Sequence, residues 1–231
     1  MDKSVSLAKK NRIFTDKEAK RKGKLIVIEG NDGSGKSTTI KYLSKYLKSI
    51  GMKNIIVKFN MSYITLKSIK KGKKAYFGPY TNTLIHATSI VDQFERYALS
   101  KLQKGYVVIC DRYIYSIIAR GIVRGVEEEK VSDLLDWVIA PDLSFYLDID
   151  PVQALDRIGS DNITFWEAGK DIIYNKEIDK SFLEFQSMVR SEFLKHSNEW
   201  EFNIIDANLP FQLRVKEICK KMKEKNMKQE V

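Results

Sequence analysis

The segment 30–38 constrains this chain more than any other part of its sequence. It fits the pattern G-x-x-x-x-G-K-[ST], directly after the apolar run 25–28 and before a helical pattern. Glycines let such a loop wrap a phosphate group, and its N–H groups and the helix N-terminus supply partial positive charge. Its nine members are candidate ATP-binding residues: Gly30, Asn31, Asp32, Gly33, Ser34, Gly35, Lys36, Ser37 and Thr38.

Two residues of this loop have specific expected roles. The ammonium of Lys36 should reach the β- and γ-phosphates of ATP, and the hydroxyl of Ser37 should bind Mg²⁺. ATP and Mg²⁺ are therefore the expected cofactors. The alternative, a glycine-rich turn that binds nothing, is disfavoured by this spacing and context.

A second candidate cluster follows the apolar run 106–110. Asp111 would provide the acidic partner that holds the metal, and Arg112 would place a fixed cation beside the transferring phosphoryl group. Taken alone, an Asp-Arg pair after a strand is equally typical of a salt-bridged strand end. Together with the phosphate loop, it favours a functional role.

Strand-like and helical patterns alternate along the chain. Strands are predicted at 25–28, 55–59, 106–110, 143–149 and 202–205, with a long helix over 81–103 and a basic helix at the C-terminus. Such alternation predicts right-handed crossovers and a parallel sheet with helices on both faces. The fold class is therefore α/β.

The net charge of +10 suggests a polyanionic partner, but it is concentrated at the ends of the chain. Residues 1–24 hold nine basic and three acidic residues, residues 214–231 hold seven and three, and the rest is neutral. We interpret these ends as solvated, with a binding arm as the alternative. The neutral body argues against a nucleic-acid partner, and no apolar run approaches the ~18 residues of a membrane helix.

The two cysteines, Cys110 and Cys219, lie in an apolar run and a periodic helical segment, which is typical of reduced core thiols. No apolar stretch follows the basic N-terminus, so a secretory signal is not expected. A cytoplasmic location follows. We divide the chain into a basic extension (1–22), one catalytic domain (23–213) and a basic C-terminal helix or tail (214–231).

Three blocks in this order carry a resemblance to a known family: GNDGSGKST at 30–38, DRYIYS at 111–116 and PDLSFYLDIDPVQALDRI at 141–158. Together they resemble thymidylate kinases, most closely an archaeal-type group. The resemblance implies a P-loop nucleoside monophosphate kinase fold with a five-stranded parallel sheet and a mobile lid. It also implies transfer of the ATP γ-phosphate to dTMP, and a homodimer.

The resemblance assigns roles residue by residue. Asp32 matches the carboxylate near the 3′-hydroxyl of the acceptor sugar, and Asp111 with Arg112 match the pair that organises Mg²⁺ and the phosphates. Ser116 occupies the family's small hydroxyl position. The lid is expected over about 157–171, since FWEAGKD resembles the archaeal-type lid.

The catalytic cation is expected to come from the lid. Some family members carry an arginine in the phosphate loop, where this chain has Gly33. Arg157 is the first candidate and Lys170 the second. The expected catalytic residues are therefore Asp32, Lys36, Arg112 and Arg157, with Lys170 among the ATP-binding residues.

The departures from the family pattern concentrate where the acceptor binds. The family's base-stacking Phe and phosphate-binding Arg align with His86 and Ile90, and the bacterial Tyr-Gln pair aligns with Arg120 and Gly121. The stretch 58–62 is nearer to the archaeal-type Trp-Asn-Ser-Ser. Besides Asp32, Arg112 and Ser116, the candidate substrate contacts are Asn60, His86, Gln93, Arg96, Tyr115 and Arg120.

These features favour a nucleoside monophosphate kinase, with dTMP as the expected acceptor. Two alternatives stay open: a kinase for another monophosphate, and a nucleotide-binding regulatory paralogue without a working acceptor site. A third, a nucleic-acid-associated ATPase, is disfavoured by the neutral body. Replacing Lys36 or Arg112 by Ala is expected to abolish transfer and leave the protein folded.

Overall fold

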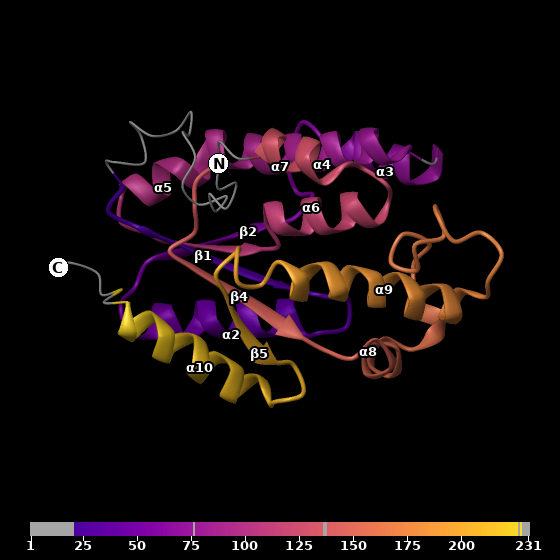
Figure 1. Cartoon of the computed structure of the whole chain (residues 1–231). Helices are drawn as coiled ribbons and strands as arrows, with labels where there is room; N and C mark the ends of the chain where they lie inside the picture. The colour runs from indigo at the N-terminus through magenta and orange to yellow at the C-terminus, as the bar shows by residue number, and fades with distance from the viewer. Residues whose placement is uncertain (1–20, 76, 136–137, 226, 228–231) are drawn as a thin grey trace, which may run out of the picture.

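Five strands form one parallel sheet in the order β2-β3-β1-β4-β5 (Figure 1). The computed structural model describes residues 21–75, 77–135, 138–225 and 227. Its strands are β1 (Lys24–Gly30), β2 (Asn54–Lys58), β3 (Val107–Asp111), β4 (Leu143–Asp148) and β5 (Phe202–Asp206). Every strand predicted from the sequence is confirmed to within two residues at each end, as is the α/β class.

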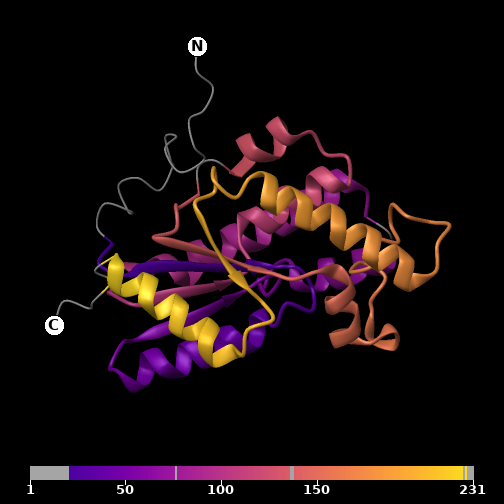
Figure 2. The same cartoon turned by 60° about the horizontal axis from the view of Figure 1, so that its bottom comes forward.

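Helices cover both faces of the sheet (Figures 1 and 2). One face carries α2 (Lys36–Ser49) and α10 (Phe211–Glu224), and the other carries α4 (Pro79–Gln93), α5 (Leu99–Gln103), α6 (Ile114–Val123) and α7 (Glu128–Leu135). Alternate side chains of strand β1 are buried on opposite faces of the sheet. Its Leu25 and Val27 enter the core under α4 to α7, while Ile26 and Ile28 enter the core against α2 and α10.

The remaining helices lie toward the carboxyl ends of the strands, and the last of them, Ile178–Lys195, also packs Phe185, Val189 and Phe193 into the core beside α4 to α7. They are α3 (Leu66–Ala75), α8 (Pro151–Ile158), the short 3₁₀ turn η2 (Ser160–Asn162) and α9 (Ile178–Lys195). Helix α8 begins at Pro151, with the Asp150 carboxylate accepting from the backbone N–H of Val152 at 2.9 Å. The segment between η2 and α9 holds most of the predicted lid.

The long helix predicted over 81–103 is confirmed, but it is not uniform. Helix α4 runs into a π-helical segment, η1 (Phe94–Ala98), and then into α5. A π-helical turn holds more residues than an α-helical one, so residues beyond Gln93 face directions that 3.6-residue periodicity does not predict.

The basic helix expected near the C-terminus is present as α10, but it is not a solvated end. Its Val215, Ile218 and Met222 are buried in the core beside α2, so this segment packs as part of the domain. The two cysteines are free thiols, with Cys110 buried and Cys219 half-buried. The extension 1–22 lies outside the described residues except for Arg21 and Lys22.

Polar residues gather at the carboxyl edge of the sheet, where β1 ends at Gly30 and β3 ends at Asp111. In open parallel sheets ligands bind at this edge, beside the loops that leave the strands. Among the described residues, no helix is long and apolar enough to cross a membrane.

Candidate active site

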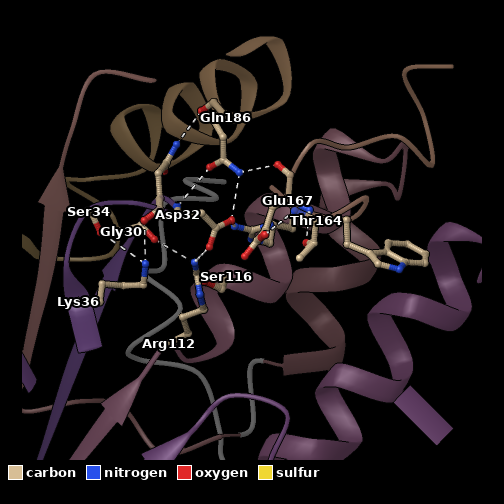
Figure 3. A network of polar contacts seen from close by, with 12 residues as sticks. Gly30, Asp32, Ser34, Lys36, Arg112, Ser116, Thr164, Glu167 and Gln186 are labelled. Carbon is tan, nitrogen blue, oxygen red and sulfur yellow. Dashed lines mark hydrogen bonds and ion pairs between the residues drawn. The ribbon is translucent and has the colours of Figure 1, made fainter. Parts of the chain in front are cut away.

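The phosphate loop joins β1 to α2 and closes tightly on itself. Gly35 caps α2 with φ of 78°, a left-handed conformation that glycine adopts without strain. The Lys36 ammonium donates to the backbone oxygen of Asn31 at 2.7 Å and lies 3.4 Å from the Ser34 hydroxyl. Figure 3 shows Lys36 folded toward the loop in this way. The ammonium is thus held at the concave side of the loop, where phosphate would bind.

Burial is the main cause of the unusual acidity of Lys36. Together with the positive charge of Arg112, it lowers the pKa of this ammonium to about 7, although Asp32 and Asp111 oppose the shift. The free protein therefore holds Lys36 partly neutral near neutral pH. Phosphate groups of a bound nucleotide would favour the charged form and raise the pKa again.

We expect ATP binding to take up a proton at pH 8 and almost none at pH 6. At pH 8 a lysine with a pKa of about 7 is mostly neutral in the free protein and becomes charged when phosphate binds. Titration calorimetry in buffers of different ionisation enthalpy measures this uptake. The control is Lys36→Arg, whose side chain stays charged and should show no such uptake; equal uptake by both proteins would contradict the prediction.

Ser37 and Asp111 form the candidate metal site. The Ser37 hydroxyl donates to a carboxylate oxygen of Asp111 at 3.1 Å, across the gap between α2 and β3. Among the described residues, no group of three or more His, Cys, Asp or Glu side chains could hold a metal ion. One hydroxyl and one carboxylate still suit Mg²⁺, which keeps water and substrate phosphate as its other ligands.

Arg112 connects the phosphate loop to α6. It adopts φ of 69°, which is unfavourable for a residue with a side chain. Its guanidinium donates to the Gly30 carbonyl oxygen at 3.0 Å, to the Ser116 hydroxyl at 3.2 Å and to Asp32 at 2.5 Å. The side chain is buried, and although burial disfavours its charge, Asp32 and other carboxylates outweigh that effect and raise the pKa of Arg112.

Asp32 lies at the centre of this network (Figure 3). One carboxylate oxygen accepts from Arg112, and the other accepts from Arg120 at 2.7 Å and from Gln186 at 3.0 Å. Burial acts to raise the pKa of Asp32, but the guanidinium groups of Arg120 and Arg112 outweigh it and hold the pKa well below its usual range. Asp32 is therefore an anion at any physiological pH.

Beneath Arg112 lies Glu29, a fully buried carboxylate at the end of β1. It accepts from the backbone N–H groups of Tyr113 (2.8 Å) and Ser116 (3.1 Å) and from the Ser116 hydroxyl (2.6 Å). Burial raises the pKa of Glu29, against the opposing charge of Arg112. Glu29 thus holds the start of α6, and with it the predicted substrate residue Ser116, in place.

Two cavities meet at this network. The loop cavity, of about 560 Å³, is lined by the phosphate loop, Asp111, Arg157 and neighbouring residues. The inner cavity, of about 250 Å³, lies between α4, α6 and the lid segment. Both are lined by Asp32, Phe59, Arg112 and Glu167, so a group bound in one could reach a group bound in the other.

Most of the sequence-predicted contacts line these cavities. Within the loop cavity lie Asp32, Gly33, Gly35, Lys36, Ser37, Thr38, Asp111, Arg112 and Arg157. The inner cavity is lined by six of the predicted substrate contacts: Asp32, Asn60, His86, Arg112, Ser116 and Arg120. The ring of His86 stacks on Phe59, with centroids 5.1 Å apart. Ligand contacts at these positions stay predictions.

Three predicted substrate residues lie outside the inner cavity. Gln93 is seven residues, about 10 Å, beyond His86 and bonds to the carbonyl of Ser89. Arg96 lies further on, in η1, and is paired with Asp92. The helix carries these two side chains past the inner cavity, so the structure does not bring them together with the other predicted substrate contacts.

Tyr115 is also placed elsewhere, because adjacent residues of a helix point about 100° apart. Its neighbour Ser116 faces the inner cavity, whereas the ring of Tyr115 packs against Trp200 and Phe202, with centroids 5.1 and 5.0 Å away. Tyr115 is a core residue.

Of the two candidate lid cations, one lines the loop cavity and the other does not. Arg157 reaches the loop cavity while donating to the Ala207 carbonyl at 3.0 Å and to the Asn208 amide oxygen at 2.8 Å. Lys170 instead donates to the carbonyl oxygens of Tyr174 and Lys176 and lines neither of these cavities. The structure thus brings Arg157, and not Lys170, to the phosphate loop.

Sequence reasoning missed several residues of this site. Glu29 had a local signal, because a carboxylate ends an otherwise apolar strand just before the loop. Glu167 lies within the FWEAGKD block of the lid, but nothing in the sequence assigned it a role of its own, and no local signal marked Gln186 or Arg214 of α10. The guanidinium of Arg214 donates to the Ser34 carbonyl oxygen at 2.9 Å and leaves no room for a side chain at Gly35.

Replacing Arg214 by Met should weaken ATP binding. The Ser34 carbonyl and the Gly35 N–H belong to one planar trans peptide, so holding the oxygen outward directs the N–H toward the phosphates. A hydrogen bond from a charged group contributes about 1.5–3 kcal/mol, so we expect the KM for ATP to rise by roughly 10- to 100-fold. Steady-state kinetics measures it, with exposed Lys216→Met as the control; an unchanged KM would contradict the role.

The fold and the site together define a P-loop nucleoside monophosphate kinase, a phosphotransferase, with one cavity at the phosphate loop and a second cavity beside it. A sequence model of the family described as "Thymidylate kinase" matches residues 28–218. The chain therefore belongs to the thymidylate kinase family.

Several relatives are similar over most of their length. "Probable thymidylate kinase 2" of Saccharolobus solfataricus is 37% identical over 195 residues, which cover 83% of this chain and 91% of that protein. "Thymidylate kinase" of Caldicellulosiruptor saccharolyticus is 35% identical, covering 70% of this chain and 85% of that protein. "Probable thymidylate kinase" of Staphylothermus marinus is 30% identical, covering 82% and 89%.

Proposed function

We propose that this chain transfers the γ-phosphate of ATP to dTMP, with Mg²⁺ as the metal. The observation that carries the proposal is the meeting of the two cavities at Asp32 and Arg112. ATP would lie along the phosphate loop, with Lys36 on its phosphates and Mg²⁺ held by Ser37 and Asp111. The acceptor would fill the inner cavity.

Within this proposal, the network residues have distinct roles. Arg112 would bind the acceptor phosphate, because it is a buried cation at the junction of the cavities. Asp32 would accept a hydrogen bond from the sugar hydroxyl, and Arg157 would stabilise charge that develops on the transferring group. Closure of the lid would exclude water from the transfer.

The choice of base is the part of the proposal that most needs a test. The inner cavity presents the stacked His86 and Phe59, and a pocket distinguishes one methyl group by only ~1–3 kcal/mol. The experiment is a panel of dTMP, dUMP, UMP, CMP, dGMP and AMP with ATP and Mg²⁺, read as ADP formed. Fastest turnover with dTMP is expected. A faster acceptor would replace dTMP, and no ADP above background with any acceptor would indicate a nucleotide-binding protein without a transferase activity.

We also propose that the chain forms a homodimer through α4. Residues 79–91 contain no charged side chain, yet Tyr80 and Leu84 are about half exposed. A helix face that is apolar, uncharged and exposed is typical of a protein interface. Light scattering should give twice the mass of the chain, and Leu84→Glu should give a monomer; a wild-type monomer would refute the assignment.

Because both cysteines are free thiols, we propose a cytoplasmic location.

A further inference from the structure

Gln186 of α9 connects the phosphate loop to the lid segment. Its side chain is fully buried, and its amide nitrogen donates both to the Asp32 carboxylate at 3.0 Å and to the Glu167 carbonyl oxygen at 2.8 Å. Its amide oxygen lies 3.4 Å from the Asp32 backbone N–H. Figure 3 shows this side chain pointing between Asp32 and Glu167.

We propose that Gln186 is a positioning residue that ties the acceptor-binding carboxylate of Asp32 to the lid at Glu167. This inference rests on the proposed function, in which Asp32 contacts the acceptor. Gln186 lines neither of the two cavities, so it acts through Asp32 and is not a catalytic residue.

The chemistry of the amide makes glutamine specific for this place. A carboxylate and a backbone carbonyl can only accept hydrogen bonds, so the group that faces both must carry two N–H donors. A primary amide provides two such donors on one planar atom, whereas a carboxylate provides none. The amide nitrogen of Gln186 therefore links the position of the lid at Glu167 to the orientation of the Asp32 carboxylate.

The contacts also predict which of the two substrates binds more weakly when the Gln186 side chain is changed. Asp32 lines both cavities, but the carboxylate oxygen that Gln186 contacts also accepts from Arg120, which lines only the inner one. The Lys36 ammonium bonds instead to Asn31 and Ser34. The Asn31 side chain bonds to the backbone oxygen of Gln186 at 2.7 Å, a contact that side-chain substitution leaves in place. A change of this side chain should therefore alter acceptor binding much more than ATP binding.

The experiment compares Gln186→Glu and Gln186→Leu in the full-length chain with Gln153→Glu, a change on the exposed side of α8. At pH 8, both Gln186 variants should raise the KM for dTMP by about 10-fold or more and leave the KM for ATP within about twofold. The control should change neither. Thermal unfolding shows whether each variant is folded, and Gln186→Glu keeps the shape of the side chain if Gln186→Leu is unstable.

A pH profile separates positioning from a merely structural role. The carboxyl introduced by Gln186→Glu would face the Asp32 oxygen that also accepts from Arg120, with Arg112 on the other Asp32 oxygen and the Glu167 carbonyl nearby. A neighbouring anion raises the pKa of a carboxyl group, so lowering the pH toward 6 should protonate it and restore one donor. The KM for dTMP of this variant should then fall toward the wild-type value, whereas Gln186→Leu should show no such recovery.

Each outcome decides for or against the inference. An unchanged KM for dTMP in both variants, an equal rise in the two KM values, or identical pH profiles would overturn it. If the wild type used another monophosphate instead, the proposed acceptor would be wrong, and the same KM comparison with that acceptor would decide the role of Gln186. Absence of transfer to every acceptor would overturn both proposals.

Discussion

Lys36→Met should lose phosphoryl transfer and remain folded. Lys36 belongs to the phosphate loop and folds back onto its backbone, so its loss would remove positive charge where we expect the transferring phosphate. We expect kcat to fall on the order of 10³-fold or more. Coupled assay of ADP formation measures it, and retention of more than about a tenth of wild-type activity would contradict the assignment.

The same variant should be at least as stable as the wild type below pH 7. Burial lowers the pKa of Lys36 to about 7 in the folded protein, whereas the unfolded chain keeps it near 10.5. Between these values the unfolded state binds more protons, so the free energy of unfolding of the wild type should rise with pH from 7 to 10. Lys36→Met should lack this rise, which denaturant unfolding at several pH values would reveal.

Arg112→Ala should lose both activity and stability. An arginine that stabilises charge in phosphoryl transfer contributes about 10³–10⁵ in rate, and this one is also the buried counter-ion of Asp32 and Glu29. Removing one partner of a buried ion pair costs about 3–5 kcal/mol when the other charge is left uncompensated; Arg120 still pairs with Asp32 here, so we expect a loss below that range. The variant is still expected to fold, but with a lower free energy of unfolding than the wild type.

A matched ion pair provides the control for Arg112→Ala. Arg190 is paired bidentately with Asp148, at 2.7 and 2.9 Å, but its side chain is about one third exposed. Partly exposed pairs contribute little, so Arg190→Ala should lower the free energy of unfolding by about 1 kcal/mol or less. Equal losses for the two variants, measured by urea unfolding, would show that Arg112 has no special structural role.

Local patterns in the sequence were sufficient to predict the parallel sheet and the position of the phosphate loop. Five apolar runs of the right length become buried strands because their alternating side chains enter the two cores. The loop could be recognised because its glycines, Lys36 and Ser37 are neighbours in the chain. Their geometry depends on short-range backbone conformation, which a spacing pattern captures.

Positions on the long helix were harder to place from the sequence. Gln93 and Arg96 were candidate substrate contacts, but in α4 it is the turn around Thr83 and His86 that faces the inner cavity. Arg96 lies in the π-helical segment η1 and pairs with Asp92, whose other carboxylate oxygen accepts from the Ser62 hydroxyl. Which face of a helix meets a cavity depends on packing, and packing is not visible in a helical period.

The fold class and the phosphate-loop motif could be predicted from the sequence, because both follow from residues close together in the chain. Which distant side chains surround that loop became known from the folded structure. Gln186 and Arg214 lie 154 and 180 residues from the loop atoms that they contact. Nothing beside them in the sequence marks these roles, since the hydrogen bonds that define them exist only once the chain has folded.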